Sequence, residues 1–282
     1  MVGIIPLLLV KITYSTKRLP EPVSSLTQKS YNWNMNFLAA LVLGVVQGLA
    51  EFLPISSSGH LVLAQSLIPG FSQPGVVFDV ILHFGTLLSV LVFFRKKLHI
   101  FLNIRFIGLL VVATLPVALI GLLFKDQVEG MFTSVRVVGF ALLITGTMNL
   151  WVDRLETKKT GLNSRNAFIT GIFQAIAIIP GISRSGSTIF ASAVQGISKR
   201  EAAEFSFILS VPAVLGANIL EIIANSQQVS GSYFPYFVGF LSAFITGILA
   251  IKLVFKVISG KHFEYFAYYC FIVGFLTILF AR

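Results

Sequence analysis

Long apolar runs recur along this chain, separated by short polar segments. A membrane-spanning helix needs about 20 mostly apolar residues. Six stretches approach this length, and we predict that each one crosses a bilayer as a helix: 76–94, 106–124, 137–151, 202–223, 234–255 and 263–280. The third stretch is short, so we expect its helix to extend beyond these bounds.

Two other apolar segments, 37–49 and 167–179, are too short to span a bilayer. Each one runs into a stretch of Pro, Gly and Ser and then into a second short apolar piece, 60–68 or 188–194. Apolar runs of 10–14 residues suit re-entrant segments. Non-helical backbone at membrane depth is tolerated only where protein or a water-filled cavity surrounds it. We therefore predict two re-entrant helical hairpins, each with a polar site at its tip.

The two broken segments resemble each other. The segment from Gly44 to Gly59 aligns without gaps with the segment that starts 127 positions later, at Gly171. The residues that are identical in the two copies are Gly44, Gln47, Ala50, Ile55, Ser56, Ser58 and Gly59. Chance similarity between glycine-rich apolar sequences explains the matching polar positions less well than a repeat does.

Three predicted spans lie between the two copies, so the second copy enters the membrane from the opposite face. In such an inverted-topology repeat the two hairpin tips meet near the bilayer midplane. The predicted fold is therefore an all-α polytopic membrane protein with six full spans and two re-entrant helical hairpins. We expect a single membrane domain, 35–282, in which repeat one covers about 36–152 and repeat two about 163–282.

The amino-acid composition is also that of a membrane protein. Hydrophobic residues make up 56% of the 282 positions and charged residues only 11%, where a soluble domain has about 25% charged residues. A soluble protein of this size cannot hide so much apolar surface in one core. The single cysteine, Cys270, excludes an intramolecular disulfide.

The net charge of +10 comes from 21 basic and 11 acidic residues, and its distribution indicates an orientation. The predicted topology places three basic residues on one side: Lys125, Arg136 and Arg282. It places 13 on the other: Arg95, Lys96, Lys97, Arg105, Arg154, Lys158, Lys159, Arg165, Lys199, Arg200, Lys252, Lys256 and Lys261. Cytoplasmic loops carry the excess of Lys and Arg. The first hairpin then enters from outside, and these cations do not indicate nucleic-acid binding.

Residues 1–34 fit this topology poorly. The apolar stretch 4–10 is too short to span, and the tail's four basic residues would lie outside, against the charge rule. We expect either a flexible N-terminal tail or a natural start at Met35.

Polar side chains gather at the two predicted tips. Ionisable groups at membrane depth are costly and are functional candidates by default. A plain alternative is one buried ion pair between Glu51 and Arg184, with serines that cap helix ends. That alternative does not account for His60 or for hydroxyls on both tips.

This set of residues suits an anion with several oxygens. Arg184 offers a planar fork of donors that matches a phosphate. Both tips also open short helices, whose N-terminal N–H groups attract anions. Glu51, with Gln47 one turn earlier on the same helix face, offers hard oxygen ligands for Mg²⁺ or Ca²⁺ rather than zinc. Ser57 is a candidate nucleophile, and His60, three residues later, is its candidate base or the acid for the leaving group.

The sequence resembles the bacterial undecaprenyl-diphosphate phosphatases of the BacA type from about Met35 to the C-terminus. The resemblance lies in Gln47-x-x-x-Glu51 followed by Pro-Ile-Ser-Ser-Ser-Gly-His60, and in Pro180-Gly-Ile-Ser-Arg-Ser-Gly-Ser-Thr188. It implies that Ser57 is the nucleophile, His60 its acid/base partner, Arg184 the phosphate clamp and Glu51 the metal-associated acid. It implies supporting, substrate-binding hydroxyls from Ser56, Ser183, Ser185 and Thr188. Many members carry Glu where this chain has Gln47, which weakens the case for Gln47 as a metal ligand.

The resemblance also implies an activity: hydrolysis of C55-isoprenyl diphosphate to the monophosphate and phosphate, dependent on a divalent cation. This reaction recycles the lipid carrier of cell-wall synthesis and is associated with bacitracin resistance. It takes place at the outer face of the bacterial plasma (inner) membrane. The competing class is a transporter or flippase of a phosphorylated lipid, because inverted repeats with broken helices are typical of transporters. The sequence allows a homo-oligomer but does not require one.

Two other features are not assigned to the predicted site. Glu204 at the start of the fourth span suits structural pairing and a site role equally well. The tyrosines at 265, 268 and 269 suit anchoring at the membrane interface.

Overall fold

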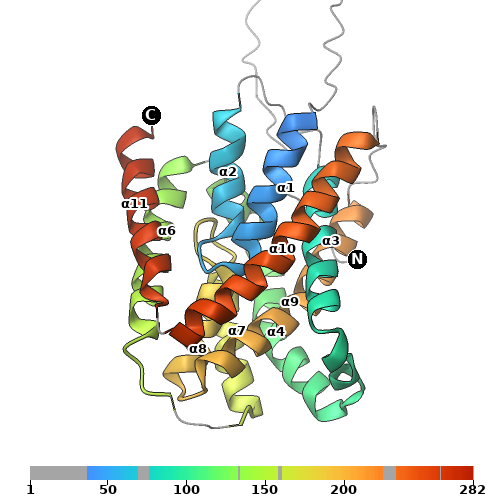
Figure 1. The fold of residues 1–282 in the computed structure, drawn as a ribbon, viewed down its shortest axis with the longest axis vertical. Coiled ribbons are helices and arrows are strands. Elements are labelled where there is room, and N and C mark those ends of the chain that lie inside the picture. The colour runs from blue at the N-terminus through green and yellow to red at the C-terminus, as the bar shows by residue number, and fades with distance from the viewer. Residues whose placement is uncertain are drawn as a thin grey trace, which may run out of the picture.

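A computed structural model describes residues 37–68, 76–132, 134–157, 161–224, 233–260 and 262–281, and in these ranges the regular structure is entirely helical (Figure 1). The α-helices are α1 (Phe37–Phe52), α2 (Ser57–Leu67), α3 (Val76–Phe93), α4 (Ile104–Leu123), α5 (Lys125–Met131), α6 (Val135–Val152), α7 (Ser164–Ile176), α8 (Arg184–Val194), α9 (Lys199–Ala224), α10 (Phe234–Gly260) and α11 (Glu264–Phe280). A 3₁₀ helix, η1 (Arg95–Leu102), precedes α4. The all-α prediction is confirmed, whereas the predicted tail, 1–34, lies outside the described residues.

Within the described ranges, four helices are long and apolar enough to cross a membrane: Ile104–Leu123, Val135–Val152, Lys199–Ile219 and Phe234–Gly260. They correspond to four of the six predicted spans, and the short third span extends at both ends as expected. The predicted spans 76–94 and 263–280 form apolar helices that are shorter. Large side chains also face outward, as on α11, where Ile272, Phe275 and Leu279 are each more than 60% exposed. A surface this apolar fits a multi-pass membrane protein.

Both broken segments form a helix, a break and a second helix. α1 ends at Phe52 and α2 begins at Ser57, while α7 ends at Ile176 and α8 begins at Arg184. Proline removes a helical hydrogen bond and glycine relaxes the backbone, so Pro54, Pro180 and Gly181 account for the two interruptions.

Each broken segment packs on a long helix from the other half of the chain. α1 packs along α10, and α7 packs along α4. A Cβ added at Gly44 of α1 would lie 2.5 Å from the Gly239 carbonyl oxygen of α10. At the matching position of α7, a Cβ on Gly171 would lie 2.5 Å from the Ala113 carbonyl oxygen of α4. The shared glycine therefore serves the same close helix–helix approach in both segments.

The remaining helices complete the framework around the two breaks. α6 packs on α11, beside which it runs in Figure 1, and it also contacts α8 and α2. α9 packs on α8 and on α3. The turn before each short helix is thereby enclosed by long helices, as the sequence predicts for polar backbone at membrane depth.

Substitution of Gly181 tests this enclosure. Gly181 has a φ of +98°, and a Cβ there would lie 2.5 Å from the Val138 carbonyl oxygen of α6. Gly181→Ala is expected to reduce stability by about 1–3 kcal/mol, because both the backbone conformation and the contact oppose a side chain. The measurement is the thermal unfolding midpoint in detergent.

Gly108→Ala is the matched control for this substitution. Nothing lies within 4 Å of a Cβ at Gly108, which is part of α4. Alanine there should leave stability unchanged or raise it by up to about 1 kcal/mol. Equal unfolding midpoints for Gly181→Ala and Gly108→Ala would contradict the structural role of the turn.

Candidate active site

Serine side chains cap both short helices in the same way. Ser56 Oγ accepts a hydrogen bond from the Gly59 backbone N–H at the start of α2. Ser183 Oγ accepts one from the Gly186 N–H at the start of α8. A capping serine fixes the first turn of a helix and leaves the other N–H groups of that turn free for a ligand.

The two tips touch each other. Ser185 Oγ in α8 donates to the Leu53 carbonyl oxygen in the first break, at 3.3 Å. A Cβ on Gly59 would lie 3.0 Å from the Gly181 Cα. The predicted meeting of the tips is therefore present in the structure, and glycines at the contact permit it.

Polar side chains of α6 brace both breaks. Thr145 Oγ1 donates to the Gly181 carbonyl oxygen at 2.8 Å and accepts from the Ser183 N–H at 3.0 Å. Asn149 Nδ2 donates to the Pro54 carbonyl oxygen at 2.5 Å. Buried backbone groups outside helices need such partners. α6 thus sets the position of one tip against the other.

An ion pair between Arg184 and Glu51 joins the two tips. The Arg184 Nη2 group donates to Glu51 Oε1, and Nη1 donates to the Ser206 carbonyl oxygen of α9 at 3.2 Å. The Glu51 side chain is 7% exposed and that of Arg184 17%. Loss of one partner from a buried pair leaves the other charge uncompensated, which costs about 3–5 kcal/mol.

The second carboxylate oxygen of Glu51 accepts two more hydrogen bonds. Ser57 Oγ donates to Glu51 Oε2 at 2.7 Å, and Gln47 Nε2 donates to the same atom at 3.0 Å. Glu51 therefore connects the candidate nucleophile to the candidate phosphate clamp. A carboxylate that accepts the hydrogen bond of a serine hydroxyl is placed to act as its general base.

His60 lies beside this centre with partners of its own. Its Nδ1 atom is 2.8 Å from the Ser56 carbonyl oxygen, and its Nε2 atom is 2.9 Å from the Tyr269 hydroxyl. A carbonyl oxygen only accepts, so Nδ1 carries the proton and Nε2 accepts from Tyr269 in the neutral ring. The hydrogen bonds of the described residues do not join His60 to Ser57, because the Ser57 hydroxyl points back to Glu51.

The other predicted hydroxyls are buried close to the pair. Ser183 Oγ and Ser185 Oγ are 3.2 Å apart, and Ser56 Oγ is 3.3 Å from Ser58 Oγ. Thr188 Oγ1 is 2.6 Å from Ser206 Oγ on α9, on the side of α8 that faces this helix. Thr188 therefore supports the second tip through its contact with α9, whereas Ser183 and Ser185 lie at the start of α8.

Four site residues escape the sequence reasoning: Thr145, Asn149, Ser206 and Tyr269. Thr145 and Asn149 are four positions apart in an apolar span, a spacing that places both on one helix face and could have identified them. Tyr269 was expected to anchor the protein at the membrane interface, but its hydroxyl contacts His60. His60 and Tyr269 are 209 positions apart, so no local sequence pattern could have predicted their contact.

Few side chains in the candidate site could coordinate a cation. The described residues contain no cluster of three or more His, Cys, Asp or Glu side chains that could hold a metal ion. Gln47 Oε1, however, is fully buried without a hydrogen-bond partner, while the Nε2 atom of the same amide donates to Glu51 Oε2. Mg²⁺ often uses one carboxylate and completes its shell with substrate phosphates and water. One amide oxygen and one carboxylate fit that kind of site.

Glu204, which the sequence assigns equally to pairing and to a site, makes no hydrogen bond or ion pair with the tips in the described part of the chain. Its carboxylate pairs with Lys97 at 2.5 Å and with Arg200 at 3.7 Å. Both partners belong to the 13 basic residues that the predicted topology places on the cytoplasmic side. The structure therefore favours the pairing role.

Comparison with known proteins agrees with this arrangement. The family described as "Bacitracin resistance protein BacA" matches residues 40–276. A protein named undecaprenyl-diphosphatase from Syntrophotalea carbinolica is 43% identical over 257 residues, which are 85% of this chain and 97% of the relative. Proteins of the same name from Methanosphaera stadtmanae and Christiangramia forsetii are 38% and 39% identical, and each alignment covers at least 87% of this chain and 98% of the relative. The chain therefore belongs to the BacA family.

Proposed function

We propose that this protein is a membrane phosphatase that hydrolyses undecaprenyl diphosphate to the monophosphate and inorganic phosphate, and so recycles the lipid carrier of cell-wall synthesis. The observation that carries this proposal is the linked group of Ser57, Glu51 and Arg184 at the contact of the two tips. The relatives named undecaprenyl-diphosphatase support the same reaction. The substrate is a lipid, which suits a site enclosed by apolar helices.

The proposed architecture is an inverted-topology repeat with six full spans and two re-entrant hairpins. Three observations support it: the matching caps at Ser56 and Ser183, the equivalent close approaches at Gly44 and Gly171, and the packing of each broken segment on the other half. The proposed setting is the bacterial plasma membrane, with the site open to the outer face. The excess of basic residues at the opposite end supports this orientation. A homo-oligomer stays a prediction.

In the proposed complex the diphosphate lies at the two helix starts, and the polyprenyl chain lies in the bilayer along the helices. Arg184 binds the terminal phosphate through its planar fork, which suits two phosphate oxygens. Free N–H groups at the starts of α2 and α8 face the same anion. Phosphoryl transfer depends mainly on such positioning and on charge neutralisation.

The proposed reaction begins with attack of Ser57 Oγ on the terminal phosphorus. Its proton passes to Glu51 along the 2.7 Å hydrogen bond. The bond from phosphorus to the bridging oxygen breaks, and its electron pair leaves with undecaprenyl monophosphate, to which His60 in its doubly protonated form donates the proton of Nε2. Water then attacks the phosphoserine and passes one proton to His60 while its oxygen bonds to phosphorus. The bond from phosphorus to Ser57 Oγ breaks, Glu51 returns its proton to that oxygen, and phosphate is released.

Gln47 and Glu51 are the residues that we propose to hold a divalent cation, Mg²⁺ or Ca²⁺. The unpartnered Oε1 atom of Gln47, whose amide contacts Glu51 through Nε2, supports this assignment. A bound cation would neutralise charge on the diphosphate oxygens.

Ser57→Ala tests the nucleophile. Loss of the attacking oxygen should lower phosphate release from undecaprenyl diphosphate by at least about 10²–10³-fold. The control is Ser58→Ala, which removes a neighbouring hydroxyl that contacts only Ser56 among the hydrogen bonds described. Ser58→Ala should retain activity within about tenfold, and a Ser57→Ala variant with the same activity would exclude Ser57 as nucleophile. Mass spectrometry of quenched reactions should detect phosphate on Ser57.

Arg184→Ala separates the clamp from the structural ion pair. This variant should lose phosphatase activity and also about 3–5 kcal/mol of stability, because Glu51 stays buried without its counter-charge. Adding Glu51→Gln should restore much of the stability and none of the activity. Thermal unfolding and phosphate release on the same samples are the measurements. Recovery of activity in the double variant would rule out Arg184 as the phosphate clamp.

Chelation tests the cation. EDTA should reduce phosphate release, and added Mg²⁺ or Ca²⁺ should restore it. Gln47→Glu adds a negative charge at the proposed ligand position and should lower the cation concentration needed for half-maximal activity by about tenfold or more. Activity that is insensitive to EDTA, or unchanged cation dependence in Gln47→Glu, would contradict the assignment.

A further inference from the structure

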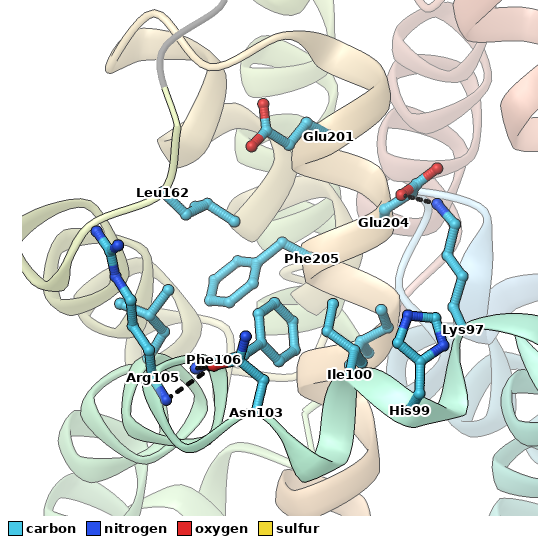
Figure 2. A pocket seen from close by; sticks show the side chains of 12 residues that line it. Lys97, His99, Ile100, Asn103, Arg105, Phe106, Leu162, Glu201, Glu204 and Phe205 are labelled. Atoms are coloured by element: carbon cyan, nitrogen blue, oxygen red, sulfur yellow. Dashed lines mark hydrogen bonds and ion pairs between the residues drawn. The ribbon is translucent and has the colours of Figure 1, made fainter.

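A second pocket lies between the beginnings of α4 and α9, at the end of the molecule where the basic residues gather (Figure 2). Its volume is about 500 Å³. The polar residues of its lining are Lys97, His99, Asn103, Arg105, Glu201 and Glu204. The apolar residues include the rings of Phe106 and Phe205. The pocket therefore combines charged groups with an apolar wall.

Two of the four formal charges in this lining already form a pair. Lys97 Nζ lies 2.5 Å from Glu204 Oε2 and closes one side of the pocket, as the dashed line in Figure 2 marks. In the described part of the chain, the side chains of Arg105 and Glu201 make no ion pair or hydrogen bond. Figure 2 shows them entering from α4 and α9 at different margins of the pocket. One cation and one anion are therefore free to bind a ligand.

A separate apolar cavity of about 460 Å³ is lined by later turns of the same two helices. On α4 the lining passes from Phe106 and Leu109 to Leu110, and on α9 it passes from Ile208 to Pro212. The residues that line this second part are Ile107, Leu110, Val111, Thr114, Leu115, Ala118, Val211, Pro212 and Leu215. The only hydroxyl among them, on Thr114, donates to the Leu110 carbonyl oxygen. We use the name groove for the charged pocket, its mouth, together with this apolar cavity, its apolar part.

This groove is separate from the proposed active site. On α9, Ser206 contacts Thr188 and Arg184 of the tip, whereas Phe205 and Ile208 line the groove. The two sites therefore use different faces of one helix, and the groove does not depend on the proposed reaction.

We propose that this groove binds a zwitterionic phospholipid whose headgroup carries a phosphate and a primary ammonium, as in phosphatidylethanolamine. The phosphate binds the Arg105 guanidinium, the ammonium donates to the Glu201 carboxylate, and one acyl chain lies in the apolar part between α4 and α9. The lining carries two positive and two negative formal charges, which matches a neutral headgroup better than an anionic one. A choline headgroup has no N–H donor for Glu201. The strongly exposed Leu102 and Ile104 beside the mouth suit contact with the bilayer.

Native mass spectrometry of the delipidated protein, with lipids of identical acyl chains, tests this proposal. Wild-type protein should bind phosphatidylethanolamine about tenfold more tightly than phosphatidylcholine, because only the former makes a charge-assisted hydrogen bond to Glu201. Glu201→Gln should bring the two dissociation constants within about threefold of each other. Arg105→Gln should weaken both lipids by about tenfold, because both carry the phosphate.

Matched controls separate these effects from a general loss of charge. Glu156→Gln and Arg154→Gln remove the same charges in the segment between α6 and α7, outside the groove lining. Both variants should bind phosphatidylethanolamine and phosphatidylcholine with the wild-type dissociation constants. Ala118→Trp, in the apolar part, should weaken both lipids by a similar factor because it fills the space of the acyl chain.

Three results would overturn the proposal. One is tighter binding of phosphatidylglycerol than of phosphatidylethanolamine, which would make the mouth a site for anionic lipids. Another is a preference for phosphatidylethanolamine that survives in Glu201→Gln. The third is displacement of phosphatidylethanolamine by equimolar undecaprenol in the wild type, since the groove would then hold a polyprenyl chain.

Discussion

The ion pair between Arg184 and Glu51 is the interaction on which the centre of this protein depends. Each charge would be costly in an apolar interior by itself, so each one requires the other. The two residues lie on different tips, and their pairing therefore ties the two broken segments together. The same carboxylate accepts the Ser57 hydroxyl, so the contact that stabilises the tips also arranges the proposed reacting groups.

The ion pair in turn needs breaks in the helices, and the breaks need support. Many backbone groups in the two turns are buried, so side chains must satisfy them. Thr145 and Asn149 on α6 bind carbonyl groups of both turns, and Ser56 and Ser183 cap the helices that follow. A small set of buried hydroxyl and amide groups thus keeps irregular backbone inside an otherwise apolar framework.

α9 contacts both the proposed active site and the groove. One of its faces holds Arg184 and Thr188 through Ser206, and another forms the groove with α4. The Lys97–Glu204 pair fixes its N-terminal end against η1. In the proposed complex, a phospholipid in the groove occupies the space between α4 and α9, and its headgroup neutralises the free charges of Arg105 and Glu201. The bilayer would then supply part of the packing around the helix that holds Arg184, the proposed phosphate clamp.

The sequence by itself determined the helical class, the long apolar helices, the two breaks and the residues at their tips. These features follow from local properties: the length of apolar runs, the positions of Pro and Gly, and the cost of charges at membrane depth. Only the tertiary structure decided which side chains pair. It joined Ser57 to Glu51 rather than to His60, gave His60 the Tyr269 hydroxyl, and assigned Thr145 and Asn149 to the turns. Such partners come from helices far apart in the chain, and their choice depends on the relative placement of packed helices, which no local pattern records.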